Sequence, residues 1–166
     1  MKKVIFVRHG KAEDSGSARN DFQRSLTPRG KEISARMADK LAAREKGDMV
    51  IITSPAFRAL ETAVIFATGL NISCDDIRMR ETIYGSFTAD RLFHLLNEIA
   101  DTVHTVVLFG HNPSFTLVVN HLSGTDSRFM PKSGVACIEF NTDRWASVPK
   151  AGSKLSYFLN PDGTDD

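Results

Sequence analysis

Residues 4–10 read Val4-Ile5-Phe6-Val7-Arg8-His9-Gly10, four apolar residues that run directly into a charged turn. A short, continuous apolar run of this kind is typical of a strand buried on both faces of a parallel sheet. Ligands of open α/β sheets bind outside the carboxyl ends of the strands, so this strand would deliver Arg8 and His9 to the crevice. An arginine fork suits phosphate, and a histidine can act as nucleophile or base. The tripeptide alone is equally compatible with a solvated pair at a strand end.

A second apolar run, residues 49–53, ends at Ser54-Pro55, a pair that predicts the start of a helix. Phe57, Leu60 and Val64 would form the apolar face of this helix, and Arg58 would lie in its first turn. A cation there opposes the helix dipole, which favours negative charge at a helix N-terminus. A shared phosphate would resolve the conflict. A solvated arginine is the alternative, and Arg58 alone does not separate the two.

A third apolar run, residues 104–109, leads into Gly110 and His111, and Pro113 then predicts another helix start. His111 therefore takes the same topological place as His9. Two histidines, each at the end of a buried strand, favour one converging site at the edge of the sheet over coincidence.

The remaining segments complete an α/β pattern. Thr27 and Pro28 predict the start of a helix that runs to about Arg44. From residue 134 the pattern alternates, which predicts a closing antiparallel pair, with Leu155, Tyr157 and Leu159 on one face of its second strand. We expect a three-layer α/β/α fold with a mostly parallel central sheet and an antiparallel edge, as one domain over residues 1–166 with a frayed tail at 161–166.

Composition excludes little but points to an ordinary globular protein. The chain has 166 residues, 42% hydrophobic and 25% charged, with a formal net charge of +1. Such a balance gives no general attraction to nucleic acid or membrane, so we expect neither as a partner. Cys74 and Cys137 match no metal-binding spacing. We expect a soluble, cytoplasmic protein without a metal or other cofactor.

Four stretches together resemble the histidine phosphatase superfamily, also called phosphoglycerate mutase-like. They are VRHG at residues 7–10, RSLTPRG at 24–30, TSPAFRALETA at 53–63 and GHNPS at 110–114. The short length resembles the small branch of SixA-like phosphohistidine phosphatases. The resemblance implies the phosphoglycerate mutase-like fold and a phosphatase that needs no metal and passes through a phosphohistidine intermediate.

The resemblance also implies roles for individual residues. His9 would be the nucleophile, and Arg8, Arg58 and His111 would hold the phosphoryl oxygens, with the bound anion favouring the charged form of His111. Glu81, in the stretch RETIYG, matches the position of a proton-donating glutamate in the mutase branch. Arg24 matches an arginine that adds positive charge at the mouth of the pocket.

Three functions follow from this resemblance. The first is removal of phosphate from phosphohistidine on a protein partner. The second is hydrolysis of a small phosphate ester on the same fold, and the third is a phosphate-recognising binding module with little turnover. The intact nucleophile favours an enzyme over a binding module, and the loops that would separate the first two cannot be traced from sequence.

Overall fold

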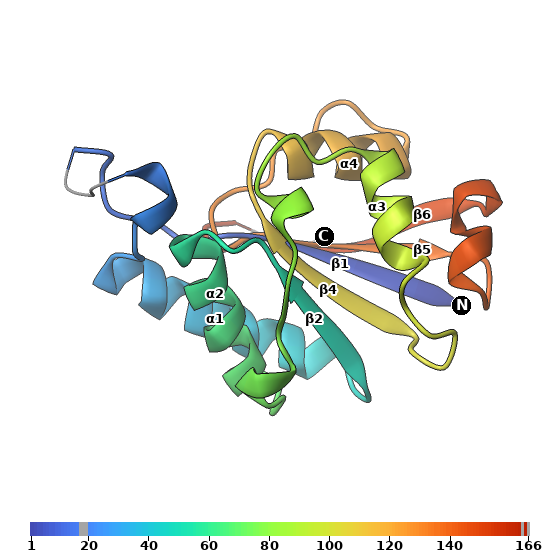
Figure 1. Ribbon diagram of the computed structural model, residues 1–166, viewed down its shortest axis with the longest axis horizontal. Coiled ribbons are helices and arrows are strands. Elements are labelled where there is room, and N and C mark those ends of the chain that lie inside the picture. Colours follow the sequence, from blue (N-terminus) through green and yellow to red (C-terminus); the bar gives the residue numbers. More distant parts are fainter. Residues whose placement is uncertain (17–19, 164, 166) are drawn as a thin grey trace.

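The computed structural model describes residues 1–16, 20–163 and 165 and builds them around a six-stranded sheet in the order β3-β2-β4-β1-β5-β6 (Figure 1). Its strands and helices, with short 3₁₀ segments labelled η, are β1 Lys2–Arg8, η1 Asp21–Gln23, α1 Pro28–Arg44, β2 Met49–Thr53, α2 Phe57–Gly69, η2 Cys74–Asp76, β3 Arg78–Met79, η3 Glu81–Ile83, α3 Ala89–Leu96, β4 Thr105–Gly110, α4 Ser114–Ser123, β5 Val135–Phe140, η4 Trp145–Lys150 and β6 Ser153–Leu159.

The sheet confirms the predicted fold class. β1 pairs in parallel with β4, which pairs in parallel with β2, and β3 extends this parallel part. β5 and β6 close the other edge as an antiparallel pair. Arg8 lies opposite Gly110, and Thr53 lies opposite Phe109. The three apolar strands therefore end at the same edge of the sheet, and the residues that follow them emerge together.

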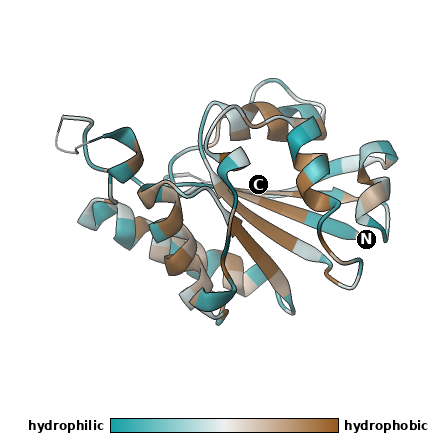
Figure 2. Ribbon diagram, in the orientation of Figure 1, coloured by the Kyte–Doolittle hydropathy of each residue, from teal (hydrophilic) through white to brown (hydrophobic). Residues whose placement is uncertain are grey.

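Helices cover both faces of the sheet, which gives three layers (Figure 1). α1 and α2 lie on one face, and α3, α4 and η4 lie on the other. Along β1, Val4 and Phe6 belong to the core beneath α3 and α4, while Ile5 and Val7 belong to the core beneath α1 and α2. All four side chains are fully buried, which explains the unbroken apolar run, and the middle of the sheet is mainly hydrophobic in Figure 2. No helix within the described ranges has the length and apolar character that a bilayer crossing requires.

The start of α1 confirms the predicted cap. The Thr27 hydroxyl accepts a hydrogen bond from the Gly30 N–H at 3.0 Å, and Pro28 is the first helical residue.

The predicted face of α2 was wrong. Phe57 and Val64 are 42% and 37% exposed, and the buried positions of the helix include Ala59, Thr62 and Ala63. Small residues face inward because α2 packs closely against α1, where a Cβ on Gly69 would lie 2.9 Å from that of Ala38. Close helix packing here selects small side chains at most inward positions of α2, where Phe66 is the one large apolar residue that is fully buried.

The predicted face of β6 was also wrong at one position. Cys137 pairs with Tyr157 but the next residue, Ile138, pairs with Leu155, so the strand carries a bulge between them. The bulge places one extra residue on β6 and reverses the side that Leu155 faces. Leu155 therefore packs against the core beneath α3 and α4, whereas Tyr157 lies in the opposite core.

Candidate active site

The ends of β1 and β4 bring His9 and His111 together. The His9 N–H donates to the Gly110 carbonyl at 3.0 Å, and the two imidazole rings lie 5.1 Å apart between centroids. Both residues are 8% exposed. The structure therefore places the two strand-end histidines side by side, as the sequence predicted.

Gly10 leaves room for this arrangement. A Cβ at this position would lie 2.6 Å from the Ser34 hydroxyl, so no larger residue fits without a shift. The Gly10 N–H donates to the Thr62 hydroxyl at 3.0 Å, and that hydroxyl in turn donates to the Arg58 carbonyl at 2.6 Å. Thr62 thus joins the turn after β1 to the first turn of α2.

The imidazole of His9 is neutral, with a free Nε2. Its Nδ1 lies 2.8 Å from the Gly10 carbonyl, and because a carbonyl oxygen can only accept, Nδ1 carries the proton. Nε2 then holds the lone pair. Burial, together with the nearby His111 and the guanidinium of Arg58, lowers the pKa of His9 to about 3. At neutral pH this ring is therefore unprotonated at Nε2, as a nucleophile must be.

His111 is held by Ser54. Its Nε2 lies 2.8 Å from the Ser54 hydroxyl, which also accepts a bond from the Ala56 N–H at 3.3 Å. Burial, and then the charge of Arg58, lowers the pKa of His111 to about 4. His111 is therefore neutral at neutral pH in the free protein. A bound anion would raise this pKa again.

Arg58 reaches the site from the first turn of α2, where its side chain is only 7% exposed. Its Nη1 donates to the Asp21 carbonyl at 2.7 Å, and its Nη2 donates to the Asp21 carboxylate at 3.0 Å. The same carboxylate accepts from Nε and Nη2 of Arg24, at 3.0 and 2.8 Å, and from the Tyr84 hydroxyl at 3.2 Å. Hydrogen bonding to Arg24 and the charge of Arg58 lower the pKa of Asp21 to about 2. The Asp21 carboxylate is therefore an internal anion that binds the guanidiniums of Arg24 and Arg58 and holds them close together.

Unused hydrogen-bonding capacity is concentrated here. Among the described residues, four buried side-chain N or O atoms have no partner, and three of them are Arg8 Nε, Arg58 Nε and His111 Nδ1. Arg8 Nη1 donates to the Met130 carbonyl at 2.9 Å, and the Arg8 guanidinium packs on the Phe129 ring. Buried polar groups are normally satisfied, so such a concentration indicates a ligand with several acceptor atoms.

Glu81 is not drawn into this cluster. It is exposed at the start of η3, and across residues 1–16, 20–163 and 165 no hydrogen bond or ion pair is recorded for its side chain. Its role as a proton donor stays a prediction. In the same described ranges, no set of three or more His, Cys, Asp or Glu side chains is arranged to hold a metal ion.

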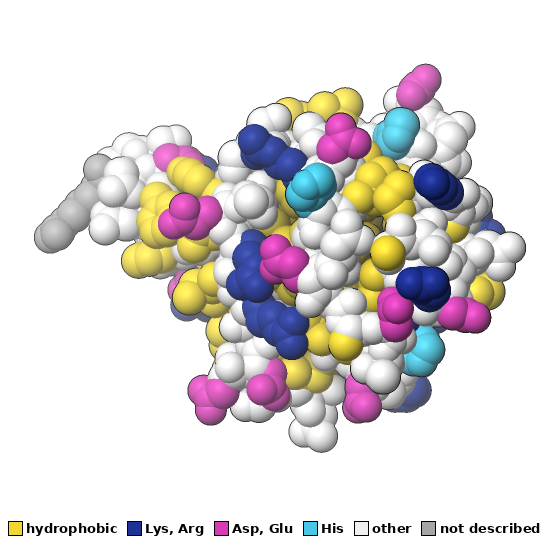
Figure 3. All heavy atoms as spheres, turned by 45° about the vertical axis from the view of Figure 1, so that its right-hand side comes forward, with side chains coloured by type: hydrophobic (Ala, Val, Ile, Leu, Met, Phe, Trp, Pro, Cys, Tyr) yellow, Lys and Arg dark blue, Asp and Glu magenta, His cyan; other side chains and the backbone are white. Residues whose placement is uncertain are grey.

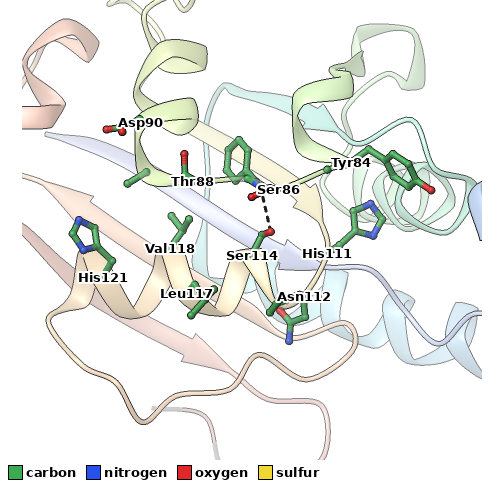
Figure 4. Close-up of a pocket in the computed structure, with 14 residues that line it drawn as sticks. Tyr84, Ser86, Thr88, Asp90, His111, Asn112, Ser114, Leu117, Val118 and His121 are labelled. Carbon is green, nitrogen blue, oxygen red and sulfur yellow. Dashed lines mark hydrogen bonds between the residues drawn. The ribbon is translucent and has the colours of Figure 1, made fainter.

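A cavity of about 750 Å³ opens beside His111 and runs between the segment before α3 and the helix α4. Figure 4 shows Tyr84 and His111 together at one end of it and His121 at the other. Phe87, Leu117 and Val118 contribute to a largely apolar lining. On the face drawn in Figure 3, hydrophobic side chains lie between charged side chains of both signs.

Sequence reasoning missed three residues of this site. Ser54 was interpreted as the cap of a helix, but α2 begins at Phe57 without a side-chain cap. Asp21 and Tyr84 lie in segments where no helical or strand pattern marks them. Their side chains join the site through contacts over 37 to 63 residues of sequence, which no local pattern reveals.

Comparison with known proteins places these features in a family. The model of the histidine phosphatase superfamily (branch 1) matches residues 4–90, just over half of the chain. No curated protein matches the chain.

Several solved structures share the fold. A protein described as phosphohistidine phosphatase SixA from Nakamurella multipartitia superposes with a TM-score of 0.81 at 21% identity, covering 98% of this chain and 97% of its own. A protein from Agrobacterium tumefaciens, described in the same words, has a TM-score of 0.77 at 27% identity, and the match covers 96% of this chain and 98% of that protein. A protein histidine phosphatase SixA complexed with tungstate has a TM-score of 0.80 at 22% identity, and the match covers 96% of this chain and 97% of that protein. The chain belongs to the histidine phosphatase superfamily.

Proposed function

We propose that this chain acts as a single-domain phosphohistidine phosphatase that removes phosphate from a protein partner through a phosphorylated His9 and without a metal ion. One observation carries the proposal. A neutral, buried histidine with a free Nε2 lies beside His111, in a cluster where Arg8, Arg58 and His111 each keep a buried nitrogen without a hydrogen-bond partner. A nucleophile and an oxyanion clamp are the two parts that phosphoryl transfer requires.

In the first half of the proposed reaction, the lone pair of His9 Nε2 forms a bond to phosphorus as the P–N bond of the substrate breaks. The substrate imidazole leaves with the bonding electrons and takes a proton from water. In the second half, water attacks the phosphorus of phosphorylated His9, the electrons of that P–N bond return to Nε2, and the proton that the attacking water loses neutralises the hydroxide left by the first half. One water molecule is consumed overall, and the products are histidine and inorganic phosphate. The Gly10 carbonyl holds the reactive tautomer of His9 throughout.

Arg8, Arg58 and His111 would bind the equatorial oxygens of the transferred group, and Arg24 would add charge at the mouth. Phosphoryl transfer depends mainly on positioning and on stabilisation of this charge, which two or three guanidiniums can supply. An imidazole leaving group needs less protonation than an alkoxide. The exposed position of Glu81 is compatible with a reaction that makes little use of a strong acid.

An exposed apolar rim supports a protein-borne substrate. Seven large hydrophobic residues are exposed within the described part of the chain, and three of them border the site: Tyr84, Leu117 and Phe129. Tyr84 packs on His111, Leu117 lines the adjoining cavity, and Phe129 packs on Arg8. Exposed apolar side chains gathered in one place are typical of a surface that another protein covers.

The test is a comparison of substrates with purified protein in the presence of EDTA. We expect kcat/KM for a phosphohistidine-bearing protein to exceed that for phosphate monoesters, and His9→Ala to abolish turnover of both. His94→Ala, which removes an exposed histidine from α3, is the matched control and should keep wild-type activity. Preference for one small phosphate ester would make the chain a small-molecule phosphatase instead. Full activity in His9→Ala would exclude the mechanism.

A further inference from the structure

We infer that Tyr84, supported by Phe22, is a specificity-determining residue that binds the imidazole ring of the phosphohistidine being cleaved. The inference rests on the proposed function and adds to it the part of the site that recognises the leaving group. The phosphate clamp treats every phosphoryl group alike, so a preference for phosphohistidine requires contacts to the ring that leaves.

Tyr84 belongs to a row of rings that leads into the site. The Phe57 and Phe22 centroids are 6.0 Å apart, those of Phe22 and Tyr84 are 5.4 Å apart, and those of Tyr84 and His111 are 5.7 Å apart. The two contacts of Tyr84 are edge-to-face, with interplanar angles of 81°. These separations lie in the range at which aromatic pairs attract each other beyond simple burial. The row ends at His111, whose other neighbour is His9.

The Tyr84 ring is both fixed and accessible. Its hydroxyl donates to Asp21 at 3.2 Å, and Phe22 packs against it, so the ring is positioned from two sides. It remains 37% exposed and lines the cavity beside His111 (Figure 4). A ring attached to the phosphoryl group on His9 would enter this space and meet Tyr84.

An aromatic platform suits imidazole better than an alkyl chain or a free amine. Aromatic rings prefer offset or edge-to-face partners, and such contacts lose little conformational entropy because both rings are rigid. A phospholysine side chain contains the same kind of P–N bond but no ring. The ratio of the two activities therefore measures recognition of the leaving group, while changes in the phosphate clamp affect both substrates.

The experiment measures kcat/KM for two peptides with identical flanks, one carrying phosphohistidine and one carrying phospholysine. We expect Tyr84→Leu to lower the phosphohistidine-to-phospholysine ratio about three- to tenfold, the range that an aromatic pair contributes. Tyr84→Phe keeps the ring and should preserve the ratio. The matched control is His94→Leu, which removes an exposed ring on α3 that belongs to neither the row nor the phosphate clamp, and it should also preserve the ratio.

The outcomes separate this inference from the function on which it rests. A wild-type protein that leaves phosphohistidine intact would refute the proposed function. If the wild-type protein cleaves phosphohistidine and Tyr84→Leu leaves the phosphohistidine-to-phospholysine ratio unchanged, only the role of Tyr84 in binding the imidazole ring would be refuted. If Tyr84→Leu folds poorly, Phe22→Leu provides the same comparison from the other side of the ring. If the wild type acts on phosphohistidine only, the loss in Tyr84→Leu relative to His94→Leu decides the question, and equal losses overturn the inference.

Discussion

Replacing Asp21 by asparagine should tighten the binding of phosphate. The Asp21 carboxylate lies between the guanidiniums of Arg58, at 3.0 Å, and Arg24, at 2.8 Å. A phosphoryl group in the clamp competes with this carboxylate for the same donors and is repelled by its charge. Asparagine keeps the size of the side chain and an acceptor oxygen but removes the charge.

The size of the effect follows from the exposure of the pair. Ion pairs at a protein surface contribute about 0.2–1 kcal/mol each. The Asp21 side chain is 53% exposed, which lowers its contribution, while the Arg58 side chain is only 7% exposed, which raises it. Taking about 1 kcal/mol for the two pairs together gives phosphate binding about fivefold tighter in Asp21→Asn.

Isothermal titration with inorganic phosphate measures this change in Kd. The gain should shrink at high ionic strength, because salt screens exposed charges. Glu32→Gln is the matched control: it removes one negative charge from an exposed pair with Arg29 on α1 and should leave Kd unchanged. Weaker phosphate binding in Asp21→Asn would refute the reasoning and would show that the carboxylate serves to hold Arg58 in position.

Four further predictions concern the clamp and its histidines. Arg58→Ala should lower kcat about 10²- to 10³-fold, since loss of one oxyanion donor costs about 3–4 kcal/mol, and steady-state kinetics would show it. Burial lowers the pKa values of His9 and His111 to about 3 and 4, so below pH 6.5 the unfolded chain binds more protons than the folded protein does. The free energy of unfolding should therefore fall by up to about 1.4 kcal/mol per pH unit for each histidine as the pH drops from 6.5 to 4.5. Urea titrations at several pH values would measure this loss. Glu81→Gln should impair hydrolysis of phosphate monoesters more than cleavage of P–N bonds, and equal losses in kcat/KM would remove Glu81 from the acid role. Incubation with a chelator should leave kcat unchanged, and clear inhibition would favour a metal-dependent reaction.

The main strands of the fold could be predicted from the sequence because local residue patterns indicate them. Buried parallel strands need apolar residues on both faces, so β1, β2 and β4 were visible as unbroken runs. The turn residues after β1 and β4 followed from the same rule, and this brought His9 and His111 to one edge before the structure was known. The cap of α1 likewise depends on neighbouring residues only.

The rest of the site depends on contacts that sequence does not encode locally. Ser54 stands before a proline and resembles a helix cap, and only the approach of His111 shows its other partner. Asp21 resembles any acidic loop residue until the fold places it on Arg58. The buried face of α2 was misjudged for a related reason, since the closeness of α1 selects small residues there. Tertiary packing, rather than periodicity, decided each of these cases.

The central claim is that His9 carries the phosphoryl group during turnover. The most direct measurement mixes the protein with a phosphohistidine-bearing substrate, quenches the reaction in alkali within milliseconds, and locates phosphate on peptides by mass spectrometry. The account predicts phosphate on the peptide that contains His9 in the wild type, and its absence together with loss of turnover in His9→Ala. Steady turnover with no phosphate on His9, or turnover that survives in His9→Ala, would contradict it.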